Sequence, residues 1–159
     1  MSQLLISLNG IDERVLKKDT NGILISETDK IKVGEKYTLL QANFSSIDDL
    51  IKAKHIINDQ IKIINEIVII NRDIDLNMIS YQYDYEHINK CYLTLTNVIY
   101  LINVLVADFN KEIRFILSFE NDNHYKIHFN NFKFSIINYL EALKKDLEKS
   151  HKINIKILD

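Results

Sequence analysis

Residues 4–26, LLISLNGIDERVLKKDTNGILIS, carry the pattern that decides the predicted fold. Apolar residues alternate at Leu4, Ile6 and Leu8, and two Asn-Gly pairs separate the short apolar stretches. An Asn-Gly pair supplies the positive φ that the tight turn of a β-hairpin needs. A similar pattern surrounds Gly34-Glu35-Lys36. The segment 1–45 therefore predicts an antiparallel β-meander, with strands at 4–8, 15–18, 23–26, 31–33 and 37–44.

Three later segments predict helices. A serine pair followed by Asp48 and Asp49 is typical of a helix start, because a serine caps the first turn and the acids meet its positive end. Apolar residues at three-to-four spacing continue to Asn71, although the β-branched stretch 66–70 leaves a strand open as an alternative. Apolar residues on several faces of the second segment indicate that this middle helix is almost completely buried. The expected helices are 46–71, 86–109 and 132–150.

The remaining strands come late in the chain. Residues 113–119 and 124–129 alternate around a polar turn, which predicts a β-hairpin. Residues 78–85 read as a further strand, and 153–157 as the last one. The 159 residues are enough for one core, so we expect a single compact α+β domain over residues 1–159. It comprises the N-terminal antiparallel β-meander, three helices with the middle one buried, the β-hairpin and a C-terminal strand.

Glycine and proline are scarce. The chain has three glycines and no proline, and the 125 residues after Gly34 contain neither. Phosphate-binding loops, dinucleotide-binding fingerprints and nucleophile elbows depend on closely spaced glycines, so none of them is predicted. Abundant Ile, Asn and Lys are typical of an A+T-rich genome, which offers a second explanation for the scarcity.

Charge and cysteine content argue against several classes of partner. The formal net charge is −2 and the basic residues are spread along the chain, so nucleic-acid binding is not expected. The single cysteine, Cys91, excludes an internal disulfide and fits a cytoplasmic location. Residues 91–107 are uncharged, but they include polar side chains and are short for a membrane span. A buried helix of a soluble protein is favoured, and no membrane partner is expected.

Two patterns resemble metal sites without completing them. His124 and His128 lie in a predicted strand, where four residues separate side chains by about 13 Å, too far for one ion. Residues 73–84 begin like a calcium-binding EF-hand loop, but Met78 stands where that loop needs glycine. The sequence predicts no metal and no other cofactor.

One pair of side chains suits chemistry. His87 and Cys91 lie one helical turn apart, with Asp84 nearby, which would suit a thiolate and imidazole pair or part of a metal site. A lone cysteine in an apolar helix is more often a packing residue. We therefore predict no catalytic residue.

A second group suits protein contact. Three tyrosines alternate in the predicted strand before two acids, and stiff aromatic side chains with acids would meet a basic protein partner. A stripe of core residues is the alternative. The predicted partner-binding residues are Tyr81, Tyr83, Asp84, Tyr85 and Glu86.

These exclusions favour a non-enzymatic protein-binding module. Examples are an inhibitor, an immunity protein that neutralises a toxin, or a chaperone for a secreted partner. Two alternatives stay open. One is a small enzyme that uses side-chain chemistry around His87, Cys91 and Asp84, and the other is a structural or oligomeric component, such as a phage-derived one.

Overall fold

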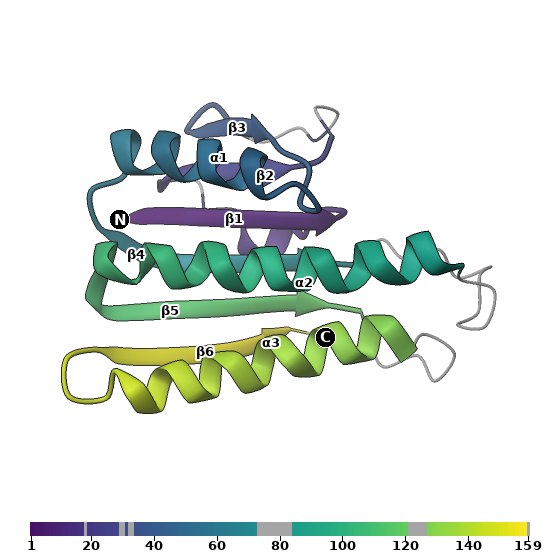
Figure 1. Ribbon diagram of the computed structural model, residues 1–159. Coiled ribbons are helices and arrows are strands. Elements are labelled where there is room, and N and C mark those ends of the chain that lie inside the picture. The colour runs from purple at the N-terminus through teal and green to yellow at the C-terminus, as the bar shows by residue number, and fades with distance from the viewer. Residues whose placement is uncertain (18, 29–30, 32–33, 73–83, 121–126, 159) are drawn as a thin grey trace.

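A six-stranded sheet organises the molecule (Figure 1). The structure is a computed structural model and describes residues 1–17, 19–28, 31, 34–72, 84–120 and 127–158. The strand order is β3-β2-β1-β4-β5-β6, and every neighbouring pair is parallel. The strands are β1 (Ser2–Asn9), β2 (Asn21–Ser26), β3 (Tyr37–Gln41), β4 (Ile64–Asn71), β5 (Phe109–Phe119) and β6 (Lys152–Leu158). The helices are α1 (Ile47–Gln60), α2 (Tyr85–Leu105) and α3 (Ile127–Asp146), with short 3-10 turns η1 (Glu13–Val15) and η3 (Val106–Asp108).

The predicted α+β fold with an antiparallel meander is wrong, because these strands are parallel in an α/β arrangement. Leu4, Leu5 and Ile6 are all fully buried, and Ile23 to Ile25 are buried too. Adjacent apolar residues are typical of parallel strands, which are covered on both faces. The sequence prediction used only the alternating apolar residues, such as Leu4 and Ile6, as evidence of a buried face. It took the residues between them to face solvent, as in a hairpin.

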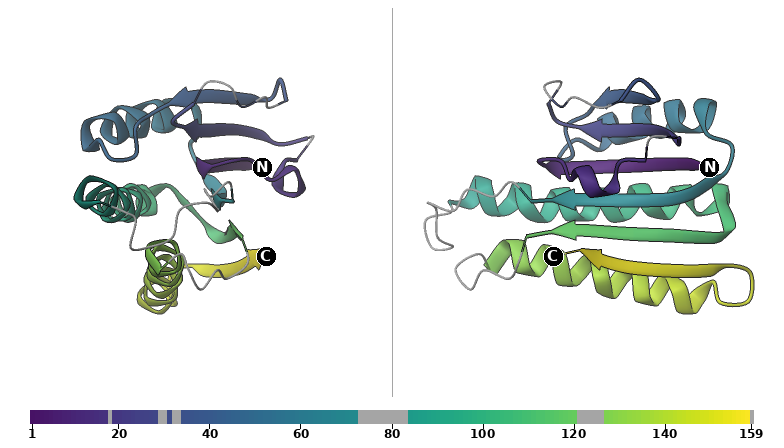
Figure 2. Two further views of the ribbon diagram at one scale, coloured as in Figure 1. Left: turned by 90° about the vertical axis from the view of Figure 1, so that its right-hand side faces the viewer. Right: turned by 180° about the vertical axis from the view of Figure 1, so that it is seen from behind.

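The three helices all lie on one face of the sheet (Figure 2). On that face, β-strand residues pack with Leu50 and Ile57 of α1, Val98 and Ile102 of α2, and Ile136 of α3. Among the described residues, the single turn of η1 and neighbouring loop residues cover the other face instead. The smaller core there consists of Leu5, Val15, Leu24, Val68, Ile70 and Ile116.

The first long helix is shorter than predicted. Ser46 caps α1, because its side chain accepts a hydrogen bond from the backbone N–H of Asp49. The helix ends at Gln60, and the β-branched stretch that follows forms β4. The strand that the sequence left open at 66–70 is therefore correct, and the helix to Asn71 is wrong.

The predicted C-terminal hairpin is also wrong. β5 contains the first predicted strand, but residues 127–129 begin α3 and β6 pairs with β5 in parallel. Val15 lies in η1 rather than in a strand, and Gly22 lies inside β2 rather than in a turn. A Cβ at Gly22 would come within 2.3 Å of the Tyr37 ring, so close packing explains this glycine. The predicted strand at 78–85 lies almost entirely outside the described residues.

The middle helix is buried on one side only. Val98, Leu101 and Ile102 of α2 face the core, whereas Leu93 and Tyr100 are exposed, so the predicted near-complete burial is wrong. Together with η3, α2 is long and apolar enough to span a membrane by length and composition. A helix that packs on a sheet in a soluble core meets the same criteria, which makes this weak evidence.

Candidate functional site

A cavity of about 230 Å³ opens at the carboxyl ends of the strands. β1 and β4 are neighbours, and the chain builds the sheet outward from them in opposite directions. Ligands of open parallel sheets bind in the crevice at such a point of reversal. We call this cavity the cleft. Its lining comprises Leu8, Asn9, Glu27, Phe44, Asn71, His87, Lys90, Cys91, Thr94, His128, Phe129 and Phe132.

Two amides form the floor of the cleft at the strand ends. The Asn9 side chain donates a hydrogen bond from Nδ2 to Asn71 Oδ1 at 3.1 Å. The pair therefore ties the end of β1 to the end of β4. Deeper in the core, the buried Asn97 of α2 donates from Nδ2 to the backbone oxygen of Phe44 at 2.9 Å, which holds the Phe44 segment against that helix.

The start of α2 brings His87 and Cys91 into the cleft. Asp84 is the cap of this helix, and its Oδ1 lies 2.9 Å from the His87 backbone nitrogen and 2.7 Å from His87 Nδ1. These hydrogen bonds from His87 lower the pKa of Asp84. Burial raises the pKa of the Cys91 thiol, so the thiol is protonated at neutral pH and is not an activated nucleophile.

His128 also reaches the cleft, although the sequence analysis placed it on a strand. It lies in the first turn of α3, with Nδ1 3.2 Å from the hydroxyl of Tyr92 on α2. The Asn131 amide donates to the same hydroxyl at 3.0 Å. His124 lies outside the described residues, as do Asp73, Asp75 and Asn77 of the calcium-like pattern. Within the described ranges, no three His, Cys, Asp or Glu side chains form a group that would hold a metal ion.

An ion pair crosses the rim of the cleft. Glu27 follows β2, and its Oε2 lies 3.7 Å from Nζ of Lys90 on α2. A second hollow, of about 400 Å³, shares both residues and is lined further by Gln41, Ala42, Asn43 and Asp49. The cleft therefore continues from an apolar interior to a polar rim.

The predicted partner-binding residues are only partly described. Tyr85 is 81% exposed at the start of α2, and Glu86 beside it is also exposed. Tyr81 and Tyr83 lie outside the described residues. That surface therefore stays a prediction.

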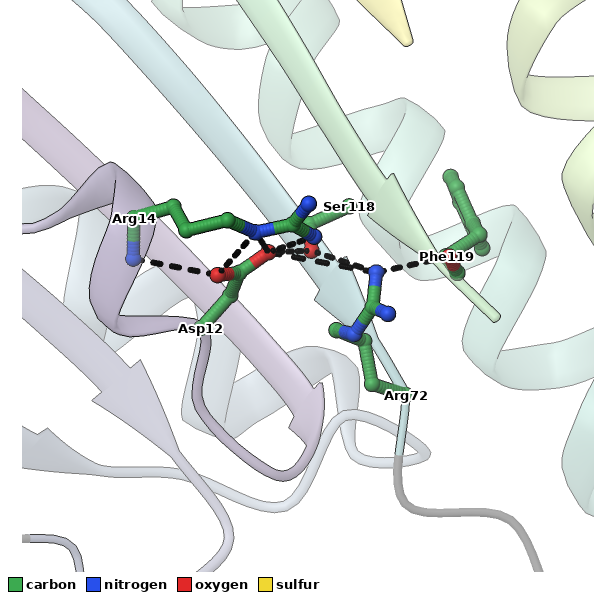
Figure 3. Close-up of polar contacts among 5 residues, drawn as sticks. All are labelled: Asp12, Arg14, Arg72, Ser118 and Phe119. Carbon is green, nitrogen blue, oxygen red and sulfur yellow. Dashed lines mark hydrogen bonds and ion pairs between the residues drawn. The ribbon is translucent and has the colours of Figure 1, made fainter. Parts of the chain in front are cut away.

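The opposite side of the same sheet edge is filled by charged side chains (Figure 3). Asp12, in the segment after β1, accepts hydrogen bonds from Arg14 Nη2 at 2.7 Å and from Ser118 Oγ at 2.6 Å. Arg72 follows β4, and its Nη1 lies 3.9 Å from Asp12 Oδ2. We call Asp12, Arg14, Arg72 and Ser118 the Asp12 cluster. Hydrogen bonds from Arg14 are the largest cause that holds the pKa of Asp12 well below its usual range.

Sequence reasoning missed most of the lining. Three polar lining residues end or directly follow a strand: Asn9, Glu27 and Asn71. In a parallel sheet the carboxyl ends of the strands share one edge, so this position would have indicated that the three side chains lie close together. The antiparallel prediction placed these ends on alternate edges. His87 and Cys91 were singled out, but for chemistry rather than for their place in a cavity.

Comparison with solved structures identifies the fold. The chain is similar to a short chain dehydrogenase family protein from Francisella tularensis, with a TM-score of 0.76 and 19% identity over 99% of this chain and 68% of that one. It is similar to 3-ketoacyl-(acyl-carrier-protein) reductase from Brucella melitensis complexed with NADH, with a TM-score of 0.72 and 16% identity over 99% and 74%. A short-chain dehydrogenase/reductase variant from Serratia marcescens matches with a TM-score of 0.72 and 9% identity over 98% and 76%. Neither family models nor curated proteins gave a match.

The chain thus has a Rossmann-like α/β fold, with the strand order typical of this fold. The prediction of a non-enzymatic protein-binding module, with an inhibitor or immunity protein as examples, is contradicted, because the structural neighbours are dehydrogenases and reductases. That prediction rested on the absence of glycine-rich loops and on metal-like spacings that were incomplete. The fold does not require such a loop.

Proposed function

We propose that this protein binds a small, ribose-bearing organic molecule in the cleft. The observation that carries the proposal is the cavity at the point where the strand order reverses, between the ends of β1 and β4. Small-molecule sites are typically concave, with apolar walls and a few polar groups. Phe44 and Phe129 supply aromatic surface, and Asn9 and Asn71 supply amide groups.

Glu27 supports the ribose part of this proposal. In Rossmann domains an acid some twenty residues beyond the first strand accepts hydrogen bonds from ribose hydroxyls. Glu27 follows β2 directly and lines both the cleft and the adjoining hollow. Its Oε1 accepts a hydrogen bond from the Phe44 backbone N–H at 3.2 Å, which fixes the carboxylate at the rim.

An oxidoreductase is the second candidate, favoured by the names of the structural neighbours, one of which is complexed with NADH. An oxidoreductase of this kind requires a binding site for the pyrophosphate of a nicotinamide dinucleotide. Oxidation of NADH or NADPH in the presence of ketone substrates, followed at the absorbance of the reduced cofactor, tests it. A protein-dependent rate would establish it, and the absence of a rate with a range of ketones would count against it.

Binding of adenosine tests the proposed function. We expect saturating adenosine to raise the melting temperature of the wild-type protein by about 2–4 °C. Cys91→Phe fills the cleft and should abolish this rise. Leu93→Phe, on the exposed side of the same helix, is the matched control and should keep it.

The same experiment can also contradict the proposed binding of a ribose-bearing molecule. If adenosine leaves the melting temperature unchanged, or if Cys91→Phe and Leu93→Phe respond alike, the cleft is not its site. A cytoplasmic location is part of the proposal, supported by the soluble fold and the single cysteine.

A further inference from the structure

The segment that follows β1 lacks the parts that hold a pyrophosphate. In dinucleotide-binding Rossmann domains, three glycines after the first strand lead into a helix whose N-terminus faces the phosphates. Here residues 10–20 contain one glycine and the three residues of η1. Gly10 has a φ of 72° and makes the turn after the strand. In the described part of residues 10–20, a dinucleotide therefore finds neither the glycine cradle nor the helix.

A carboxylate of the protein occupies the same segment. The Asp12 side chain is 5% exposed and caps η1 by accepting a hydrogen bond from the Arg14 backbone N–H at 3.1 Å. The Arg14 side chain donates from Nε to both carboxylate oxygens of Asp12, to Oδ1 at 2.9 Å and to Oδ2 at 3.2 Å. Ser118, at the carboxyl end of β5, is fully buried and donates its hydroxyl to Asp12. A planar anion is thus bound by two kinds of donor that also suit phosphate.

Arg72 completes this arrangement from a third strand end. Its backbone N–H bonds the Asn9 carbonyl at 3.1 Å, and its Nη1 donates to the Phe119 carbonyl at 2.8 Å. The side chain therefore lies across the ends of β1, β4 and β5, beside Asp12 (Figure 3). Because the buried Asp12 carboxylate already pairs with both guanidinium groups, it lowers the positive charge that a phosphate would find there.

We propose that Asp12 is a built-in anion that stands in the place of a ligand phosphate, so that this protein takes ligands without a pyrophosphate and does not hold a nicotinamide dinucleotide in the manner of its fold. The choice of ligand rests on the proposed function, because the cleft on the other side of the strand ends remains open. The role of Asp12 as an internal anion is independent of it.

Removal of the carboxylate tests the internal anion. Asp12→Ala leaves Arg14 and Arg72 without this anion, and inorganic phosphate should then raise the melting temperature of the variant by about 2–4 °C. Wild-type protein and Glu13→Ala, which removes the neighbouring exposed acid, should show no such rise. An equal response of all three proteins to phosphate would overturn the inference.

Wild-type protein supplies a second measurement if Asp12→Ala does not fold. We expect adenosine to raise the melting temperature of the wild type, pyrophosphate to leave it unchanged, and NADH to raise it by no more than adenosine does. A rise with NADH that exceeds the rise with adenosine would overturn the inference and support the oxidoreductase. Absence of an adenosine effect would count against the proposed function alone, because the phosphate response of Asp12→Ala does not depend on the cleft.

Discussion

The two faces of the sheet both bury apolar residues, but different elements cover them. On one face, three helices cover an apolar core, and at the carboxyl ends of the strands this side opens into the cleft. On the other face, loops and η1 cover a smaller core, and the Asp12 cluster closes the same edge. In the described residues after β1, η1 and an internal ion pair lie where dinucleotide-binding Rossmann domains have a phosphate-binding helix.

The largest effect should come from matched truncations on β4. Ile69 and Ile70 are both fully buried but face opposite sides of the sheet. Ile69→Ala should lower the free energy of unfolding by about 4 kcal/mol, because the helices cannot collapse into the cavity. Ile70→Ala should cost about 2–3 kcal/mol, because loops relax more easily. Urea denaturation measures both, and equal costs would mean that the loop-covered face is as rigid as the helical one.

Removal of the Asp12 carboxylate should lower the free energy of unfolding by less than Ile69→Ala does. Asp12→Ala removes hydrogen bonds to Arg14 and to the buried Ser118, and should lower the free energy of unfolding by about 2–3 kcal/mol. The exposed neighbour serves as a control, since Glu13→Ala should change it by less than about 0.5 kcal/mol. Chemical denaturation at low phosphate compares them. If the two variants are equally stable, the cluster contributes nothing to the fold.

The acid dependence of stability should carry the signature of Asp12. The pKa of Asp12 is lowered in the folded protein, so its ionised form contributes stability above the unfolded value near 3.9 and loses it as the pH falls further. The stability difference between wild type and Asp12→Asn should therefore be constant from about pH 5 to 8 and should shrink below about pH 4. Denaturation curves across this range measure it. A difference that grows on acidification would contradict the assignment.

The smallest effect should come from a second charged group on the loop-covered face. Glu66 on β4 is 1% exposed and bonds Lys17 at 2.7 Å and the Gln3 amide at 2.6 Å. Glu66→Gln keeps the shape and loses the charge, so it should lower the free energy of unfolding by about 1–2 kcal/mol. Thermal unfolding checks this value. A variant more stable than the wild type would show that the buried charge is a net cost.

The sequence predicted the elements better than their arrangement. β1, β2, β5 and β6 were found from their apolar residues, and Ser46 and its acids marked the start of α1. Strand direction was missed, because Asn9-Gly10 and Asn21-Gly22 also suit hairpins and alternation alone does not separate one buried face from two. The runs Leu4-Leu5-Ile6 and Ile23-Leu24-Ile25 carried the better signal. The scarcity of glycine argued against a phosphate-binding loop, but it was wrongly extended to a non-enzymatic protein-binding function.

The candidate site was predictable only in fragments. His87 and Cys91 share the cleft as their helical spacing suggested, whereas Asn71 and His128 join them through tertiary packing that no local pattern encodes. The Asp12 cluster joins residues from segments that lie far apart in the chain. Such a cluster follows from strand order, which a single sequence does not state.

Calorimetric titration of the wild-type protein with adenosine and with NADH compares a ligand that lacks a pyrophosphate with one that carries it. We expect adenosine to bind and NADH to bind no more tightly, because this protein has no binding site for the pyrophosphate of the dinucleotide. An affinity for NADH more than about tenfold above that for adenosine, equal to about 1.4 kcal/mol of added binding free energy, would contradict it.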